Sequence, residues 1–116
     1  MAQAHAAVGM ALIGGAILFT LAAAVAVALG GGSWIEGVRV ALTTALGIQV
    51  TLGVASFLNE ARPAGSLHLL YGVLALVTLP FASFFAGEAP PGARAKVLTA
   101  GGLVTTGLMW RLAVTG

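Results

Sequence analysis

Four long apolar runs, separated by short polar segments, restrict the fold of this chain more than any other feature. They cover residues 5–29, 38–58, 67–86 and 95–114, and a helix of about 20 residues is long enough to cross the hydrocarbon core of a bilayer. Only 7% of the 116 residues are charged, whereas roughly a quarter are charged in a soluble domain. We therefore predict an all-α integral membrane protein, a four-helix bundle that forms one domain over residues 1–116.

The segments between the runs carry turn-forming residues. Gly30-Gly31-Gly32-Ser33 interrupts the first run, residues 59–66 reverse the chain after the second, and residues 87–92 end the third, because glycine and proline break regular structure. Ser66 is a typical helix N-cap residue, and Pro80 predicts a kink in the last third of the third helix.

Composition excludes several classes of function. The net charge is only +2 and is spread over the ends of the runs, so the sequence offers no basic patch for nucleic acid. The chain has no cysteine, which excludes disulfides, thiolate metal sites and thiol catalysis.

Counting four crossings predicts the topology. The N-terminus, the segment at residues 59–66 and the C-terminus should lie on one side of the membrane. That side carries Arg62 and Arg111, and the other carries Arg39, Arg94 and Lys96. Because basic residues favour the cytoplasmic side, we expect the termini to be extracytoplasmic, in the plasma membrane of a prokaryote.

The only two histidines stand in equivalent places. His5 begins the first apolar run with Gly9 four residues later, and His68 begins the third run with Gly72 four residues later, at an offset of 63. Since both runs start from the same side, the histidines should lie at the same depth.

The second and fourth runs also correspond, at an offset of 54. Gly47, Val50, Thr51 and Gly53 match Gly101, Val104, Thr105 and Gly107. We therefore predict two helical hairpins related by a pseudo-two-fold axis along the membrane normal. The glycines of these runs also suit close helix packing in lipid.

Two histidines at the same depth in a membrane indicate that they bind a cofactor. Zinc or copper would need three or four ligands, which the helices do not supply. Two axial imidazoles complete the coordination of a heme iron, so we predict one heme b bound by His5 and His68. The alternative, in which each histidine simply meets water and headgroups near the interface, remains open.

Four further residues are candidates for contact with the heme. Gly9 and Gly72 lack side chains one turn after each histidine, which would let the porphyrin edge lie against the helix backbone. Arg62 and Arg111 lie on the same side and can pair with heme propionates, although interfacial arginines also extend to the headgroups without any ligand.

The middle of the chain resembles the heme A synthase family. Gln49-Val50-Thr51-Leu52-Gly53 followed by His68-Leu69 is similar to that family's Gln-x-x-Leu-Gly helix, which precedes a helix opening with His-Leu. His5 is similar to the histidine that opens the preceding helix of the family's four-helix unit, and the resemblance covers about residues 1–80. It implies a bis-histidine heme site on the outer side.

The sequence departs from the family at the residues tied to catalysis. The family's catalytic half carries a glutamate three residues before the first histidine, where Ala2 stands here, and an arginine after it, where Ala6 stands. The cysteine pair of many members is absent. Heme binding is therefore expected more than heme oxidation.

The sequence thus predicts a membrane-embedded, cytochrome b-like protein for electron transfer or heme handling. It could act as a homodimer or within a larger respiratory complex. Two alternatives remain open: a half-size enzyme similar to heme A synthase, and a cofactor-free structural subunit of a membrane complex.

Overall fold

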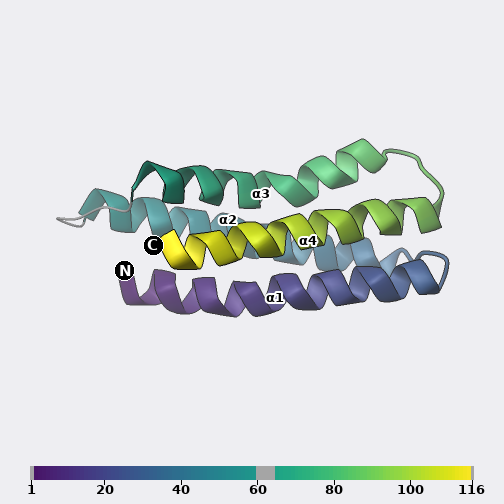
Figure 1. The fold of residues 1–116 in the computed structure, drawn as a ribbon, viewed down its shortest axis with the longest axis horizontal. Coiled ribbons are helices and arrows are strands. Elements are labelled where there is room, and N and C mark those ends of the chain that lie inside the picture. Colours follow the sequence, from purple (N-terminus) through teal and green to yellow (C-terminus); the bar gives the residue numbers. More distant parts are fainter. Residues whose placement is uncertain (1, 60–64, 116) are drawn as a thin grey trace.

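Four helices run back and forth along one axis (Figure 1). The computed structural model describes residues 2–59 and 65–115. The helices are α1 (Ala2–Ala28), α2 (Trp34–Asn59), α3 (Ser66–Ala86) and α4 (Pro91–Thr115). The molecule measures 50 × 21 × 20 Å, and each helix is long and apolar enough to cross a membrane. The predicted all-α, four-helix class is confirmed.

The two termini lie at the same end of the bundle (Figure 1). His5 is in the first turn of α1 and His68 is in the first turn of α3, so both stand at this end, which we call the histidine end. The connections from α1 to α2 and from α3 to α4 lie at the opposite end. The prediction from the number of crossings, that both histidines lie on the same side, is therefore confirmed.

Two helices begin earlier than predicted. Helix α2 starts at Trp34 rather than residue 38, and α4 starts at Pro91 rather than residue 95. Proline is well suited to the first turn of a helix, because the backbone N–H that it lacks has no partner there. Glu36 lies in the first turn of α2, where an acidic residue is favourable because of the helix dipole.

Differences at the other helix starts are smaller. Helix α1 spans Ala2–Ala28 instead of residues 5–29, which puts His5 inside the first turn. Helix α3 begins at Ser66, and Gly65 is its N-cap, without a side-chain hydrogen bond. The prediction that Ser66 caps this helix is therefore wrong by one position.

The glycine-rich segment after α1 ends the helix as expected. Gly30 and Gly31 have φ angles of 80° and 111°, in the region that favours glycine. The Gly31 N–H donates to the carbonyl of Ala26 at 2.6 Å. A Cβ atom on Gly31 would collide with Cβ of Pro91, so the two turns at this end touch.

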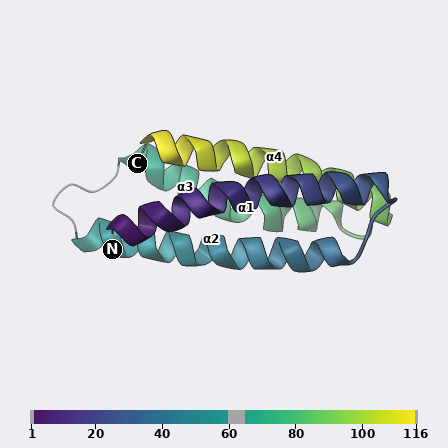
Figure 2. The ribbon, with the colours of Figure 1, turned by 90° about the horizontal axis from the view of Figure 1, so that it is seen from below.

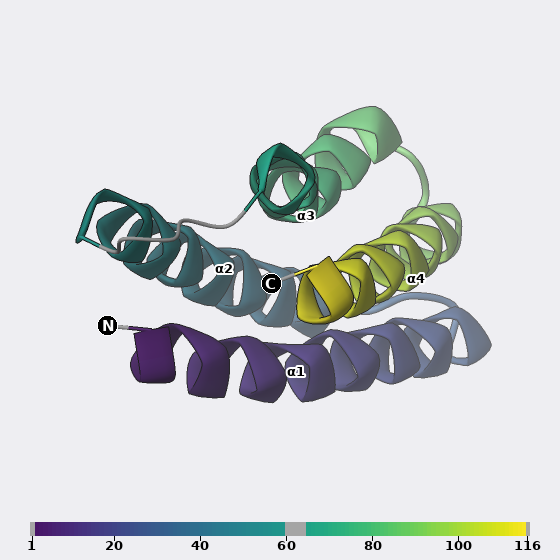
Figure 3. The ribbon, with the colours of Figure 1, turned by 60° about the vertical axis from the view of Figure 1, so that its left-hand side comes forward.

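Helices α1 and α3 occupy opposite corners of the bundle, with α2 and α4 at the other two corners (Figure 3). Helix α4 packs closely against both α1 and α3, whereas α2 contacts α3 much less. Figure 2 shows α1 running from the side of α2 near the N-terminus to the side of α4 further along. Pro80 lies inside α3, whose last part changes direction (Figure 1).

Adjacent glycines let α4 approach both of its neighbours. A Cβ atom on Gly102 would lie 2.5 Å from Oγ1 and 3.2 Å from Cα of Thr20 on α1. On Gly101 it would lie 3.0 Å from Cβ of Ala82 on α3. Both glycines are buried, as close packing of helices in lipid requires.

Large apolar side chains cover the outside of the bundle. Phe84 is 85% exposed and Phe85 is 72% exposed. In a bilayer such side chains contact lipid chains, so the exposed surface agrees with a membrane location.

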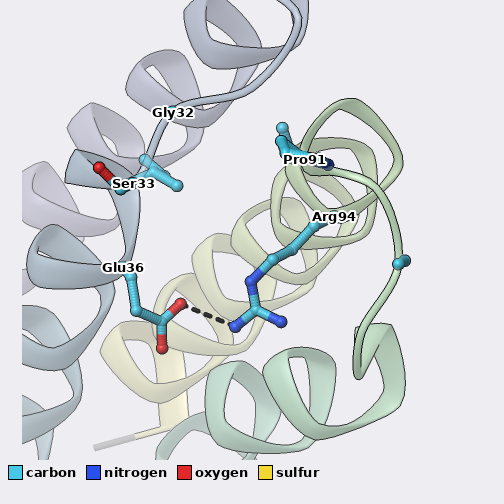
Figure 4. A pocket seen from close by; sticks show the side chains of 8 residues that line it. Gly32, Ser33, Glu36, Pro91 and Arg94 are labelled. Atoms are coloured by element: carbon cyan, nitrogen blue, oxygen red, sulfur yellow. Dashed lines mark hydrogen bonds and ion pairs between the residues drawn. The ribbon is translucent and has the colours of Figure 1, made fainter.

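A polar cluster joins three helices at the end opposite the histidines. Arg94 on α4 donates to Glu36 on α2 at 2.8 Å, and also to the hydroxyl of Ser83 and the carbonyl of Gly87. Arg39 donates to the same carboxylate at 2.7 Å. Figure 4 shows Glu36 and Arg94 reaching toward each other between α2 and α4.

We predict that Gly102→Ala destabilises the bundle, because its methyl group would collide with α1. Overpacking of this kind costs about 1–3 kcal/mol. Gly14→Ala is the control, since its Cβ would meet nothing within 4 Å. Thermal unfolding in detergent should show a lower midpoint for Gly102→Ala only. Equal midpoints would contradict the close contact between α1 and α4.

Candidate functional site

The structure brings the two histidines together from diagonal helices. The ring centroids of His5 and His68 are 5.9 Å apart, and the ring planes make an angle of 67°. Both side chains are partly buried. Since 63 residues separate them in the sequence, this pairing depends on the packing of the whole bundle.

A cavity of about 640 Å³ surrounds the histidine pair at this end of the bundle. Its volume lies within the range of cofactor and ligand sites. All four helices contribute to its wall, which includes both histidines, Gly9, Gly72 and Gln49. Most of the remaining wall is apolar, for example Ile13, Leu46, Leu69, Val73 and Leu112.

Helices α1 and α2 interlock around His5. A Cβ atom on Gly53 would lie 2.9 Å from Cε1 of His5, and one on Gly9 would lie 3.0 Å from Nε2 of Gln49. Each glycine therefore makes room for a polar side chain of the other helix. The Gln49 amide nitrogen also donates to the backbone carbonyl of His5 at 2.7 Å. Gly9 thus accommodates Gln49, in addition to lining the cavity where the porphyrin edge was predicted.

His68 has different surroundings. Its Nδ1 lies 3.4 Å from the hydroxyl of Thr115 on α4. That hydroxyl donates to the carbonyl of Arg111 at 2.8 Å, so its oxygen is available to accept from an Nδ1–H group. A Cβ atom on Gly72 would meet only Leu112, at 4.0 Å, so the cavity is open in front of this glycine.

Several buried polar atoms in the cavity wall lack a protein partner. They are Nδ1 of His5, Oε1 of Gln49 and Oγ of Ser56, which make no hydrogen bond within the part of the chain that the structure describes. Gln49 is 8% exposed and Ser56 is 7% exposed. Nearly all buried polar groups in proteins are hydrogen-bonded, so these three atoms distinguish the side of the cavity formed by α1 and α2 from the rest of its wall.

Of the two candidate arginines, Arg111 is not part of the cavity wall. Arg111 extends over the outer surface, where its guanidinium carbon lies 5.6 Å from the ring centroid of Tyr71. This is within the range of a cation–π contact. Arg62 lies outside the described residues. Pairing of either arginine with a propionate stays a prediction.

Within residues 2–59 and 65–115, no three histidine or carboxylate side chains gather as they would around a bare metal ion. The histidine pair supplies only two nitrogen ligands, which suits a metal whose other ligands come from a macrocycle.

Sequence reasoning missed two polar residues of this site. Ser56 follows Gln49 and Gly53 on one face of α2 at helical spacing, and this pattern could have been recognised. The sequence did not identify Thr115 as part of the site, because threonines in apolar helices commonly form hydrogen bonds to the backbone of their own helix.

Comparison with known proteins adds no relative: no protein-family model, curated protein or solved structure matches this chain. The resemblance to the heme A synthase family therefore stays a prediction, and function has to be inferred from the geometry of the site.

We predict that Thr115→Val changes the environment of the His68 ring, because valine keeps the shape of threonine but removes the acceptor oxygen. Nitrogen-15 NMR of labelled histidine in bilayers should show altered His68 ring signals and unchanged His5 signals. Thr106→Val is the control, since Thr106 bonds only to the Gly102 carbonyl of its own helix among the contacts described. Identical His68 signals in both variants would contradict the contact with Thr115.

Proposed function

We propose that this protein binds one heme b between His5 and His68 and works as a cytochrome b-like electron carrier or heme-handling protein in the membrane. The observation that carries the proposal is the pair of imidazole rings, 5.9 Å apart, in a cavity of about 640 Å³. Both rings come from the only two histidines of the chain.

The geometry of the pair suits two axial ligands. Nitrogens that bind one metal ion from opposite sides are roughly 4 Å apart, since each bond is about 2 Å long. The ring centroids must be further apart than the nitrogens, because each centroid lies behind its nitrogen, and the separation of 5.9 Å agrees with this. The angle of 67° between the ring planes is compatible with two imidazoles that would hold one iron.

Thr115 supports the same assignment. If its oxygen accepts the Nδ1–H of His68, the Nε2 lone pair of that ring is left for the iron. Metal-binding histidines commonly donate their other ring N–H to a nearby acceptor, which fixes the tautomer and the ring orientation.

The surroundings favour electron transfer over reactions with oxygen. A bound heme would supply one-electron redox chemistry. If His5 and His68 both held a heme iron, it would have no free position for a small molecule. The cavity lies near one end of the bundle, which keeps the distance to a partner at the membrane surface short.

We further propose that the histidine end faces the extracytoplasmic side of a prokaryotic plasma membrane. The opposite end carries Arg39, Arg94 and Lys96, and basic residues favour the cytoplasmic side. The apolar outer surface would allow contact with a second copy or with a larger respiratory complex.

We predict that the purified protein shows a Soret band and a sharp reduced α-band. His5→Ala and His68→Ala should each abolish the six-coordinate spectrum, because each removes one axial ligand. Gly14→Ala should leave the spectrum unchanged. Absorption spectra of oxidised and dithionite-reduced protein provide the measurement.

The absence of a Soret band, even when heme is supplied during expression, would reject heme binding and favour the cofactor-free subunit. A hydroxylated heme product, found by extraction and mass analysis, would instead favour the half-size enzyme similar to heme A synthase.

The orientation can be tested by cysteine labelling, since the natural chain has no cysteine. We predict that Ser66→Cys reacts with a membrane-impermeant maleimide in intact spheroplasts, because it lies at the histidine end. Glu88→Cys should react only after the membrane is opened. The reverse pattern would place the histidine end in the cytoplasm.

A further inference from the structure

We propose that Gln49 is a positioning residue that sets His5 for binding to the iron. It acts through an interlock of four residues, His5 and Gly9 on α1 with Gln49 and Gly53 on α2, which we call the Gln49 interlock. This inference rests on the proposed heme site and adds the device by which one of its two ligands is held.

The interlock is reciprocal. Each helix contributes one polar side chain and one glycine four residues later, which is the spacing of neighbours on one helix face. Because α1 and α2 are antiparallel, His5 lies on Gly53 while Gln49 lies on Gly9. The closest distances from a built Cβ atom are 2.9 Å and 3.0 Å, so neither contact leaves room for a methyl group without movement.

A hydrogen bond fixes the register of the interlock. The Gln49 side chain donates to the His5 carbonyl at 2.7 Å, and Gln49 is almost fully buried. This bond holds the backbone of the residue whose ring must bind iron. It can form in only one register of α1 against α2, because a shift of either helix would separate the two groups.

The polar atoms beside this bond are buried. Nε2 of Gln49 donates to the His5 carbonyl, while Oε1 of Gln49 and Nδ1 of His5 are buried without a hydrogen-bond partner among the described residues. The His5 ring is therefore positioned by its contact with Gly53 and by the bond to its own backbone carbonyl, and not by a hydrogen bond to Nδ1.

The second half of the bundle has no such interlock. At the predicted offset of 54 residues, Gln49 corresponds to Leu103, which is 63% exposed, and Gly53 corresponds to Gly107. A Cβ atom on Gly107 would meet nothing within 4 Å, and one on Gly72 would make only an ordinary contact at 4.0 Å. The repeat thus provides Gly107, which lies outside the cavity wall, as a matched control for Gly53.

The first test compares glycine pairs in the heme-loaded protein. Gly53→Ala and Gly9→Ala should weaken heme binding roughly tenfold, in the range seen when support of a metal ligand is lost. Both should also produce a partly high-spin spectrum, because His5 no longer reaches the iron in every molecule. Gly107→Ala should match the natural protein, because its Cβ atom would meet nothing within 4 Å. An equal effect of Gly107→Ala would overturn the proposal.

The second test examines Gln49 itself. Gln49→Met keeps the length of the side chain but removes the hydrogen bond, and it should also raise the high-spin fraction. The double variant with Gly9→Ala should be no worse than the more affected single variant, because both changes disrupt one contact and contacting residues are not additive. Additive losses would show that Gln49 does not act through Gly9.

A third measurement does not depend on heme. In heme-free protein, nitrogen-15 NMR of labelled histidine should show shifted His5 signals and constant His68 signals for Gly53→Ala and Gln49→Met. If the natural protein takes up no heme, the proposed function fails, whereas these signals still decide the interlock. Unchanged His5 signals in both variants would overturn it.

Discussion

The close approach of α4 to both α1 and α3 is the contact on which the rest of the structure depends. Gly101 faces α3 and Gly102 faces α1, so one helix sets the positions of two helices that stand at opposite corners. This contact affects the histidine pair, because His5 lies on α1 and His68 lies on α3. These two helices are not consecutive in the sequence. Helix packing in a membrane has little hydrophobic driving force, and small residues at the interface supply close contact instead.

The two ends of the bundle differ in how their helices are packed. At one end, Glu36 and Arg94 join α2 to α4, and Ser83 adds α3, so the helices are tied by hydrogen bonds and charge. At the other end, a cavity opens among the four helices. The polar cluster thus holds the helices together far from the cavity.

Most of the fold could be predicted from the sequence, because length and composition leave few alternatives in a bilayer. The shared depth of His5 and His68 followed from the parity of the crossings. The starts of α2 at Trp34 and of α4 at Pro91 were predicted too late in the sequence. Charged residues and proline are compatible with either a loop or a first helical turn. The residues that hold the two histidines in place could not be recognised from the sequence either. The partner of Gln49 is a backbone carbonyl 44 residues away, and Thr115 resembles any other threonine in an apolar helix.

The position of the Gln49 interlock along the chain has a consequence for biogenesis. All four of its residues belong to α1 and α2, so the first hairpin can set His5 while the rest of the chain is still being synthesised. The contact of His68 with Thr115 joins α3 to the last turn of α4. The contact of His68 is therefore formed only after α4 has been synthesised to its last turn. A chain truncated before Thr115 would keep the Gln49 interlock and lose the contact of His68.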